Sequence, residues 1–124
     1  MAKNLVYRRV RGLKATVPSG ALSGDPVVVG SLPGVCIDDA DANDEATVDF
    51  DGVYALDVEG VDDGGNAAIG AGEPVYFTIG DTPKINAKES GTFFGYLAPD
   101  SSVGSGATAA VNVFVHPGYV YVAP

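Results

Sequence analysis

Short apolar runs separated by glycine and proline are the feature that most restricts the fold of this chain. Valine is the commonest residue, with 18 copies against 6 leucines, and β-branched side chains suit a strand better than a helix. Turn formers are frequent, with 17 glycines and 8 prolines among 124 residues. No stretch has a helical period, and residues 38–46 are predicted to form a loop or single turn. The chain is therefore predicted to be all-β, a small single-domain barrel or sandwich of about nine short strands.

The strands expected after an interrupted segment at 5–17 are 26–30, 34–38, 48–58, 74–79, 84–87, 92–98, 108–115 and 119–122. The first two of these are joined by Ser31, Leu32 and Pro33, which predicts a hairpin. Between Val48 and Val58 the even positions are apolar or glycine, and several odd positions are acidic. This period of two favours one strand, bent or bulged at Gly52, over a hairpin at that glycine.

Two segments share a local pattern of a small residue, glycine, an acid, proline, valine and an apolar strand. They are residues 23–30 and 71–78. Proline suits the first position of a strand because the hydrogen-bond donor that it lacks lies at the sheet rim. The repeat indicates either two pseudo-symmetric halves of one barrel or a chance recurrence of turn chemistry.

The charged residues are divided unevenly along the chain. Residues 1–17 carry five basic and no acidic side chains, whereas residues 18–124 carry two basic and sixteen acidic ones, so the net charges are +5 and −14. Such asymmetry is typical of a docking tail. We therefore divide the chain into an extended basic N-terminal docking arm, residues 1–17, and a β body, residues 18–124. The arm residues expected to make contacts are Lys3, Leu5, Tyr7, Arg8, Arg9, Arg11 and Lys14.

Three partners are compatible with the basic arm. Phosphate is one, although the acidic body would be repelled from a polyanion. The others are an acidic protein surface and the acidic segment of the same or a neighbouring subunit. Exposed ion pairs contribute only ~0–1 kcal/mol each, so the arm would also need apolar anchors. Leu5, Val6, Val10 and Leu13 could supply them.

Several classes of protein are excluded or disfavoured by composition. The net charge of −9 argues against a general nucleic-acid binder. No apolar run approaches the ~18–20 residues of a membrane span, so no membrane contact is expected. The segment after Met1 lacks the apolar core of a signal peptide. A single cysteine excludes an internal disulfide and every multi-cysteine zinc site.

No set of residues predicts catalysis. His116 is the only histidine and precedes Pro117 in a turn-like context. Cys36 lies between Val35 and Ile37 and is expected to be a buried, unreactive thiol. No glycine-rich loop has the lysine and helix of a phosphate site. We therefore predict no catalytic, cofactor-binding or metal-binding residues and no cofactor.

An acidic segment at residues 38–63 contains eleven acids and no basic residue. Asp39 to Asn43 match the first ligand positions of a calcium loop, but Asp44 replaces the turn glycine and Phe50 replaces the final glutamate. Three interpretations stay open: a solvated outer face, an irregular calcium site, or a carboxylate pair for glycoside hydrolysis.

The order of several motifs resembles that of a family of small tailed-bacteriophage proteins that decorate, or cement, the capsid. The most specific stretch is Ser23-Gly24-Asp25-Pro26-Val27-Val28-Val29-Gly30-Ser31-Leu32-Pro33-Gly34-Val35, followed by residues 52–56, 72–76, 95–98, 104–106 and 111–113. Two departures are the more basic arm and the longer tail after Val115. The resemblance implies a β-rich domain on the outside of an assembled shell, commonly a trimer at threefold or quasi-threefold positions, which bridges major capsid protein subunits without catalysis or cofactor.

The first functional hypothesis is therefore a structural virion protein, assembled in the host cytoplasm, whose arm docks on the outer capsid surface. The alternative is a calcium- or carbohydrate-binding β module, such as a head fibre for host attachment, with its site between Asp38 and Asp51. Strands that look apolar on both faces predict a subunit interface, or equally a core. The candidate interface residues are Val111, Val113, Phe114, Tyr119 and Tyr121.

Overall fold

The computed structural model describes residues 12–115, and within that range the chain is all-β, as predicted. Eleven strands, rather than about nine, occur among these residues. They are β1 (Leu13–Thr16), β2 (Pro26–Val29), β3 (Leu32–Cys36), β4 (Glu45–Asp49), β5 (Gly52–Glu59), β6 (Val61–Asp62), β7 (Gly65–Asn66), β8 (Pro74–Phe77), β9 (Ile85–Asn86), β10 (Thr92–Leu97) and β11 (Thr108–Val115). The described range contains no helix long and apolar enough to cross a lipid bilayer.

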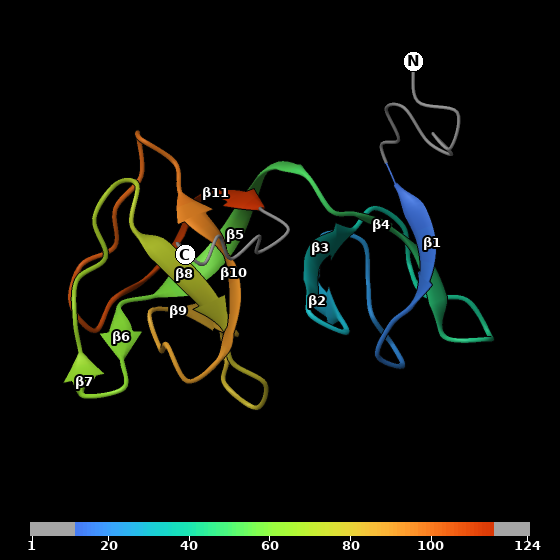
Figure 1. Ribbon diagram of the computed structural model, residues 1–124, viewed down its shortest axis with the longest axis horizontal. Helices are drawn as coiled ribbons and strands as arrows, with labels where there is room; N and C mark the ends of the chain where they lie inside the picture. The colour runs from blue at the N-terminus through green and yellow to red at the C-terminus, as the bar shows by residue number, and fades with distance from the viewer. Residues whose placement is uncertain (1–11, 116–124) are drawn as a thin grey trace, which may run out of the picture.

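The strands form two main units that lie side by side (Figure 1). The first, which we call the small sheet, has four strands in the order β1-β4-β3-β2. The second is a closed barrel in the order β10-β11-β5-β9-β8, accompanied by the two-stranded ribbon β6-β7. The sequence left a barrel and a sandwich open; the structure has a closed barrel, but it contains only the second half of the chain.

The predicted hairpin between β2 and β3 is confirmed. Val29 pairs with Leu32 and Pro26 pairs with Val35, so only Gly30 and Ser31 form the turn. Gly30 has a φ of +65°, a left-handed conformation that glycine adopts without steric cost. The turn is therefore one residue earlier than the sequence pattern suggested.

The chain passes from the small sheet to the barrel between β4 and β5. The period of two continues through this crossing, with Val48, Leu56 and Val58 all buried. β4 and β5 nevertheless belong to different sheets, so the single strand predicted for residues 48–58 is divided at residues 50–51. The bend at Gly52 is where the chain changes sheets, and a hairpin there is excluded.

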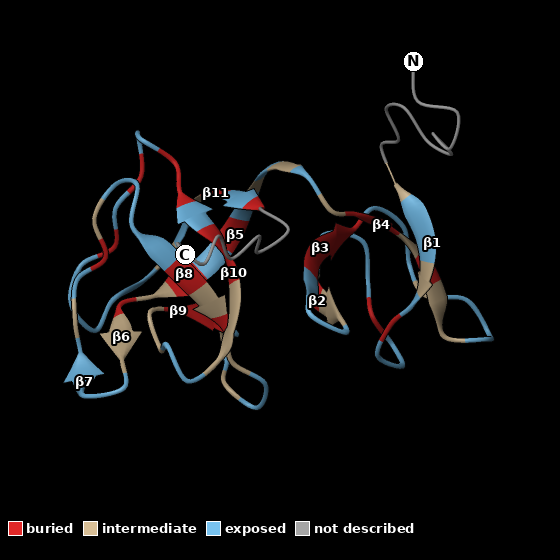
Figure 2. Ribbon diagram, in the orientation of Figure 1, coloured by how far each residue is buried: buried red, intermediate tan, exposed pale blue. Residues whose placement is uncertain are grey.

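Two clusters of buried side chains fill the two units (Figure 2). The barrel cluster includes large residues such as Phe94, Leu97 and Ile85. The small-sheet cluster is Val17, Ala21, Val27, Cys36, Ala46 and Val48. Val35 of β3 belongs to the barrel cluster, and Val28 of β2 packs against it. The inner face of the β2–β3 hairpin therefore holds the small sheet against the barrel.

The repeated segments at 23–30 and 71–78 do not form two halves of one barrel. Pro26 opens β2 and Pro74 opens β8, so each proline begins a strand as expected. β2 is an edge strand of the small sheet, whereas β8 pairs on both sides within the barrel. The shared pattern reflects how a strand begins and not a common position in the fold.

Candidate functional site

The basic arm meets the described structure only at its C-terminal end. Lys3, Leu5, Tyr7, Arg8, Arg9 and Arg11 lie outside the described residues. Lys14 lies on β1, which pairs with β4 at the edge of the small sheet away from the barrel (Figure 1). Its Nζ lies 3.4 Å from Asp41 Oδ2 and 3.9 Å from Glu45 Oε1. Because this cation is exposed, these pairs add little stability and orient the side chain along the loop before β4.

Carboxylates of the acidic segment brace this loop from within. Asp38 Oδ1 accepts the Thr47 N–H at 2.7 Å, and Asp39 Oδ1 accepts the Ser23 N–H at 2.8 Å. Asp41 Oδ1 accepts the N–H groups of Asn43 and Glu45 at 2.8 and 3.0 Å. Those two backbone bonds, with a smaller contribution from Lys14, lower the pKa of Asp41. Each of these carboxylates therefore accepts backbone hydrogen bonds in a different part of the loop.

The acids of residues 38–63 do not form one surface. Those up to Asp51 belong to the small sheet and the crossing, whereas Asp57, Glu59, Asp62 and Asp63 belong to the barrel half. Among residues 12–115, no group of three or more His, Cys, Asp or Glu side chains is placed to hold a metal ion. The partial calcium-loop match at Asp39 to Asn43 thus corresponds to a hydrogen-bonded turn.

The candidate interface residues on β11 differ in exposure. Val113 is fully buried in the barrel cluster, and Val111 is half-buried and packs against it. Phe114 points outward and is 43% exposed. Tyr119, Tyr121 and His116 lie outside the described residues. The outward side chain of Phe114 is thus the part of this set that a partner can reach on the described barrel.

Cys36 is buried in the small-sheet cluster, with 1% of its surface exposed. Burial raises the pKa of its thiol, and the nearby carboxylates of Asp25 and Asp38 raise it further. A raised pKa keeps the sulfur protonated at neutral pH and lowers its nucleophilicity. The predicted buried thiol is confirmed.

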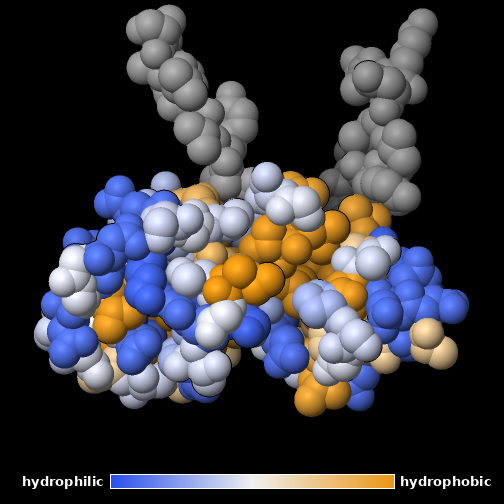
Figure 3. Space-filling model, turned by 90° about the horizontal axis from the view of Figure 1, so that it is seen from below, coloured by the Kyte–Doolittle hydropathy of each residue, from blue (hydrophilic) through white to orange (hydrophobic). Residues whose placement is uncertain are grey.

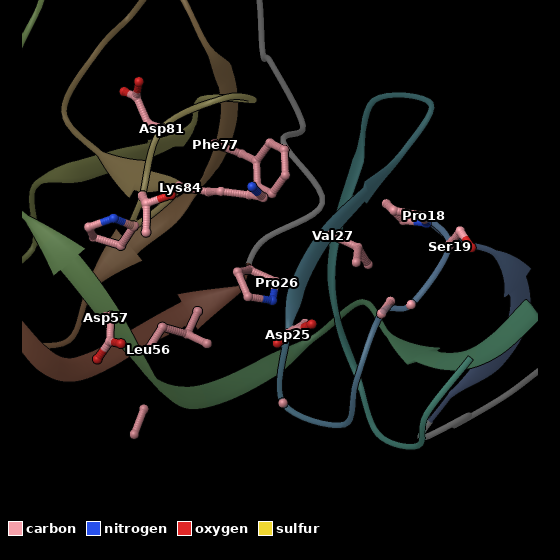
Figure 4. Close-up of a pocket in the computed structure, with 16 residues that line it drawn as sticks. Pro18, Ser19, Asp25, Pro26, Val27, Leu56, Asp57, Phe77, Asp81 and Lys84 are labelled. Carbon is pink, nitrogen blue, oxygen red and sulfur yellow. The ribbon is translucent and has the colours of Figure 1, made fainter. Parts of the chain in front are cut away.

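A groove of about 570 Å³ runs between the small sheet and the barrel (Figure 4). Residues 18–21 and 24–27 line one wall, and residues 55–57, 77 and 81–84 line the other. Val27, Leu56 and Phe77 contribute apolar surface, whereas Asp25, Asp57, Asp81 and Lys84 contribute charge. Sequence reasoning missed this groove because its lining comes from separate segments that meet only in the folded chain.

The hydrophobic surface near the middle of the molecule and the hydrophilic surface toward both ends are visible in Figure 3. The described part of the chain is thus an all-β structure with exposed apolar surface near its middle. Its described side chains offer contact surfaces, and the carboxylates that line the groove disfavour an anionic ligand.

Comparison with known families identifies the class of protein. The family model for the phage cement protein matches residues 8–113, and the chain belongs to this family. The resemblance drawn from the sequence is thereby confirmed. This is a family of structural virion proteins and not of enzymes, so the chain has a structural role in a phage capsid. No curated protein and no solved structure matches the chain.

Proposed function

We propose that this protein binds the outer surface of an icosahedral phage capsid and stabilises it by bridging neighbouring major capsid protein subunits. The family match across residues 8–113 is the observation that carries this proposal. The protein would act as a homotrimer at threefold or quasi-threefold positions after assembly in the host cytoplasm. It would contact neither nucleic acid nor membrane.

The distribution of charge supports a division of labour between the arm and the body. Residues 1–17 carry +5, and the remaining residues carry −14. A basic arm that binds an acidic shell surface would leave the acidic body directed outward. Three arms on one trimer would bind together, and their avidity would exceed the affinity of a single arm.

The described structure allows the arm to be removed without cutting a strand. β1 begins at Leu13, directly after Gly12, the first residue that the structure describes. Deletion of residues 2–11 should therefore leave the small sheet intact, whereas a cut at Lys14 would remove half of β1. The measurement is binding of the full and shortened proteins to capsids that lack the cement protein, with circular dichroism as a check of folding.

We expect the shortened protein to fold and to lose about 100-fold or more in capsid affinity. The matched control neutralises a cation on the barrel, Lys84→Gln, and should bind normally. Unchanged binding by the shortened protein would show that the arm assignment is wrong. Failure of the full chain to bind capsids, or binding without an increase in capsid melting temperature, would overturn the proposed function itself.

A further inference from the structure

The outer edge of β2 is open along the groove between the small sheet and the barrel. Within the described residues, β2 is the last strand of the small sheet and pairs only with β3. The Cys36 N–H donates to the Asp25 carbonyl oxygen at 2.9 Å, which fixes the phase of this pairing. Because the backbone groups of successive residues point to opposite sides of a strand, those of Val27 point toward β3. Those of Pro26 and Val28 therefore point outward.

Three outward backbone groups have no hydrogen-bond partner among residues 12–115. They are the Val28 N–H and the carbonyl oxygens of Val28 and Pro26. An unpaired strand edge of this kind can accept a further strand through main-chain hydrogen bonds. An antiparallel strand would bond both Val28 groups through one residue, which cannot be proline because proline has no N–H.

The space beside this edge follows the length of β2. The groove of about 570 Å³ is lined by Pro26 and Val27 of β2 (Figure 4). A second hollow of about 350 Å³ is lined by Val28 and by Gly30 of the following turn. Phe77 of the barrel lines both hollows, so they follow one another along the edge. A strand added to β2 would therefore lie between the small sheet and the barrel.

The lining of the groove favours an occupant with apolar and basic side chains. Val28 packs against the barrel cluster, and the residue opposite it on an added strand would share that side of the sheet. Its side chain would meet the apolar wall that includes Leu56. Asp25 and Asp57 line the groove and join no ion pair in the described part of the chain, whereas Lys84 is the only cation in the lining. A basic side chain would complement the two carboxylates.

The other open edge of the small sheet lacks these features. β1 carries Lys14, and a charged side chain is a common protection against strand addition. Residues of β1 line neither hollow. The four residues of β2, by contrast, carry no charge. Strand addition is therefore expected at β2 and not at β1.

We propose that β2 binds an extended segment of the major capsid protein, which joins the small sheet as an added strand and lies in the groove. The segment carries an apolar side chain opposite Val28 and a basic side chain near Asp25 and Asp57. This inference rests on the proposed function, because it names the part of the shell protein that the body holds. The docking arm joins β1, so the arm and the groove would use opposite edges of one sheet (Figure 1).

The direct test is hydrogen exchange at the Val28 amide, measured by NMR on the full chain. Labelling is done on the free protein and on the protein bound to capsids that lack the cement protein. In the free protein the Val28 amide should exchange about 100-fold faster than the Val27 amide, which pairs with β3. Binding should slow Val28 exchange about 10-fold or more, because the amide gains a hydrogen bond, and the Val27 rate is the internal reference.

A second test fills the groove from its barrel wall. Ala55 is exposed and lines the groove, so Ala55→Trp should weaken capsid affinity about 10-fold or more. The matched control is Ala110→Trp, which is exposed on the neighbouring strand and lies outside the lining. Asp57→Lys should weaken affinity about 5-fold, and the exposed Asp51→Lys, outside the groove, is the control for the change in charge. Circular dichroism checks the fold of each variant.

The outcomes separate this inference from the proposed function. Slower Val28 exchange on capsids, with weaker binding by Ala55→Trp and not by Ala110→Trp, supports the inference. Capsid binding that leaves the Val28 rate unchanged, or normal binding by a folded Ala55→Trp, overturns the inference and leaves the proposed function standing. Normal binding by Asp57→Lys overturns the assignment of a basic side chain to the segment.

Two further outcomes would also overturn the inference. The Val28 amide could exchange slowly in the free full chain and rapidly after deletion of residues 2–11, which would place the chain's own arm on this edge. A full chain that does not bind capsids would overturn the proposed function and this inference with it.

Discussion

The small sheet and the barrel differ most in the side chains that fill them. The barrel cluster contains Phe94 and Phe77, stacked with ring centroids 6.3 Å apart, together with leucine and isoleucine. The small-sheet cluster consists of valine, alanine and one cysteine. Burial of a large apolar side chain contributes about 1.5–3 kcal/mol, and alanine contributes far less. The barrel therefore holds most of the stability that hydrophobic burial supplies.

The small sheet and the barrel share part of one core. Val35 of its central strand β3 is fully buried within the barrel cluster. Loss of the barrel would expose this side chain, whereas opening of β1 would leave the barrel strands paired. Local opening is thus expected to be easiest at β1, the edge strand that joins the proposed docking arm. The exposed Phe114, by contrast, lies on the more stable unit.

The largest difference in unfolding free energy between the two units should appear when core side chains are truncated. Phe94→Ala should cost about 3–5 kcal/mol of unfolding free energy, because it removes a fully buried ring from the barrel. Val48→Ala in the small sheet should cost about 2 kcal/mol, since it removes two methyl groups. Urea denaturation followed by circular dichroism measures both. An equal cost for the two changes would show that the small sheet is as important to stability as the barrel.

Glycines at close backbone approaches give the next largest effect. A Cβ on Gly60 would lie 2.2 Å from the Gly104 carbonyl oxygen, where backbone must move. A Cβ on Gly34 in the small sheet would meet the Val48 side chain at 2.4 Å. We expect Gly60→Ala to cost about 3 kcal/mol and Gly34→Ala about 1–2 kcal/mol.

The matched control for these glycines is Gly104→Ala. Its Cβ would meet only Ala107, at an ordinary distance of 3.8 Å, so its cost should lie within about 0.5 kcal/mol. Thermal unfolding of the three variants tests the ranking. If Gly34→Ala lowers the free energy of unfolding more than Gly60→Ala does, the small sheet tolerates an added methyl group less well than the barrel half. The expected order of the two units is then wrong.

The sequence predicted those strands whose apolar residues follow a pattern within the strand itself. β11 occupies residues 108–115 as expected, and the hairpin of β2 and β3 needed only two apolar runs and a short turn. The division into two sheets was missed because β4 and β5 continue one alternating pattern across the crossing. Periodicity records which side of a strand faces inward and carries no information on which sheet the strand joins.

The candidate surfaces were less predictable than the strands. Val113 and Phe114 are adjacent apolar residues, and the sequence alone could not assign one to the core and the other to the surface. Their register partners on β5 and β10 make that distinction. The outward neighbours Tyr96 and Val53 of Phe114 were missed, since they lie on strands that are separated from β11 in the chain. The docking arm stays a prediction because residues 1–11 lie outside the described range.

A smaller effect is expected at the crossing that connects the two units. Asp49 is buried, its Oδ1 accepts the Asp51 N–H at 3.1 Å, and its other oxygen accepts the Tyr54 hydroxyl. Tyr54→Phe removes that donor and should cost about 1–2 kcal/mol. Tyr76→Phe, on the outer face of the barrel, is the control and should be nearly neutral. Equal unfolding midpoints for the two variants would exclude a structural role for the Asp49–Tyr54 bond.

The smallest effect concerns one carboxylate in each unit, Asp41 beside the small sheet and Asp81 in the barrel half. The pKa of Asp81 is lowered mainly by its hydrogen bond and ion pair with Lys88, whose Nζ lies 2.7 Å from Oδ2. The pKa of Asp41 is lowered mainly by the backbone N–H groups of Glu45 and Asn43. A carboxyl group whose pKa is lowered by folding stabilises the folded state at a pH above its unfolded pKa, which is 3.8 for both groups. That stabilisation is lost as the pH falls through the pKa of the folded state.

An ion pair lowers the pKa of Asp81, and backbone hydrogen bonds lower that of Asp41. Because the two interactions respond differently to salt, an experiment at two salt concentrations can tell the two units apart. The Lys88 and Asp81 side chains are 30% and 29% exposed, so solvent and salt still reach their ion pair, and the pKa of Asp81 should move toward its ordinary value at about 1 M NaCl. The pKa of Asp41 should move less, because its main donors are neutral backbone groups held by the fold of the loop. Carbon-13 NMR titration of the carboxyl groups at low and high salt measures both values in one sample. If the pKa of Asp41 moves as far as that of Asp81, Lys14 and not the backbone dominates at Asp41, and the loop beside β1 is held by charge. The edge strand that joins the arm would then open more readily as salt rises, whereas a loop held by its backbone would keep β1 paired with β4.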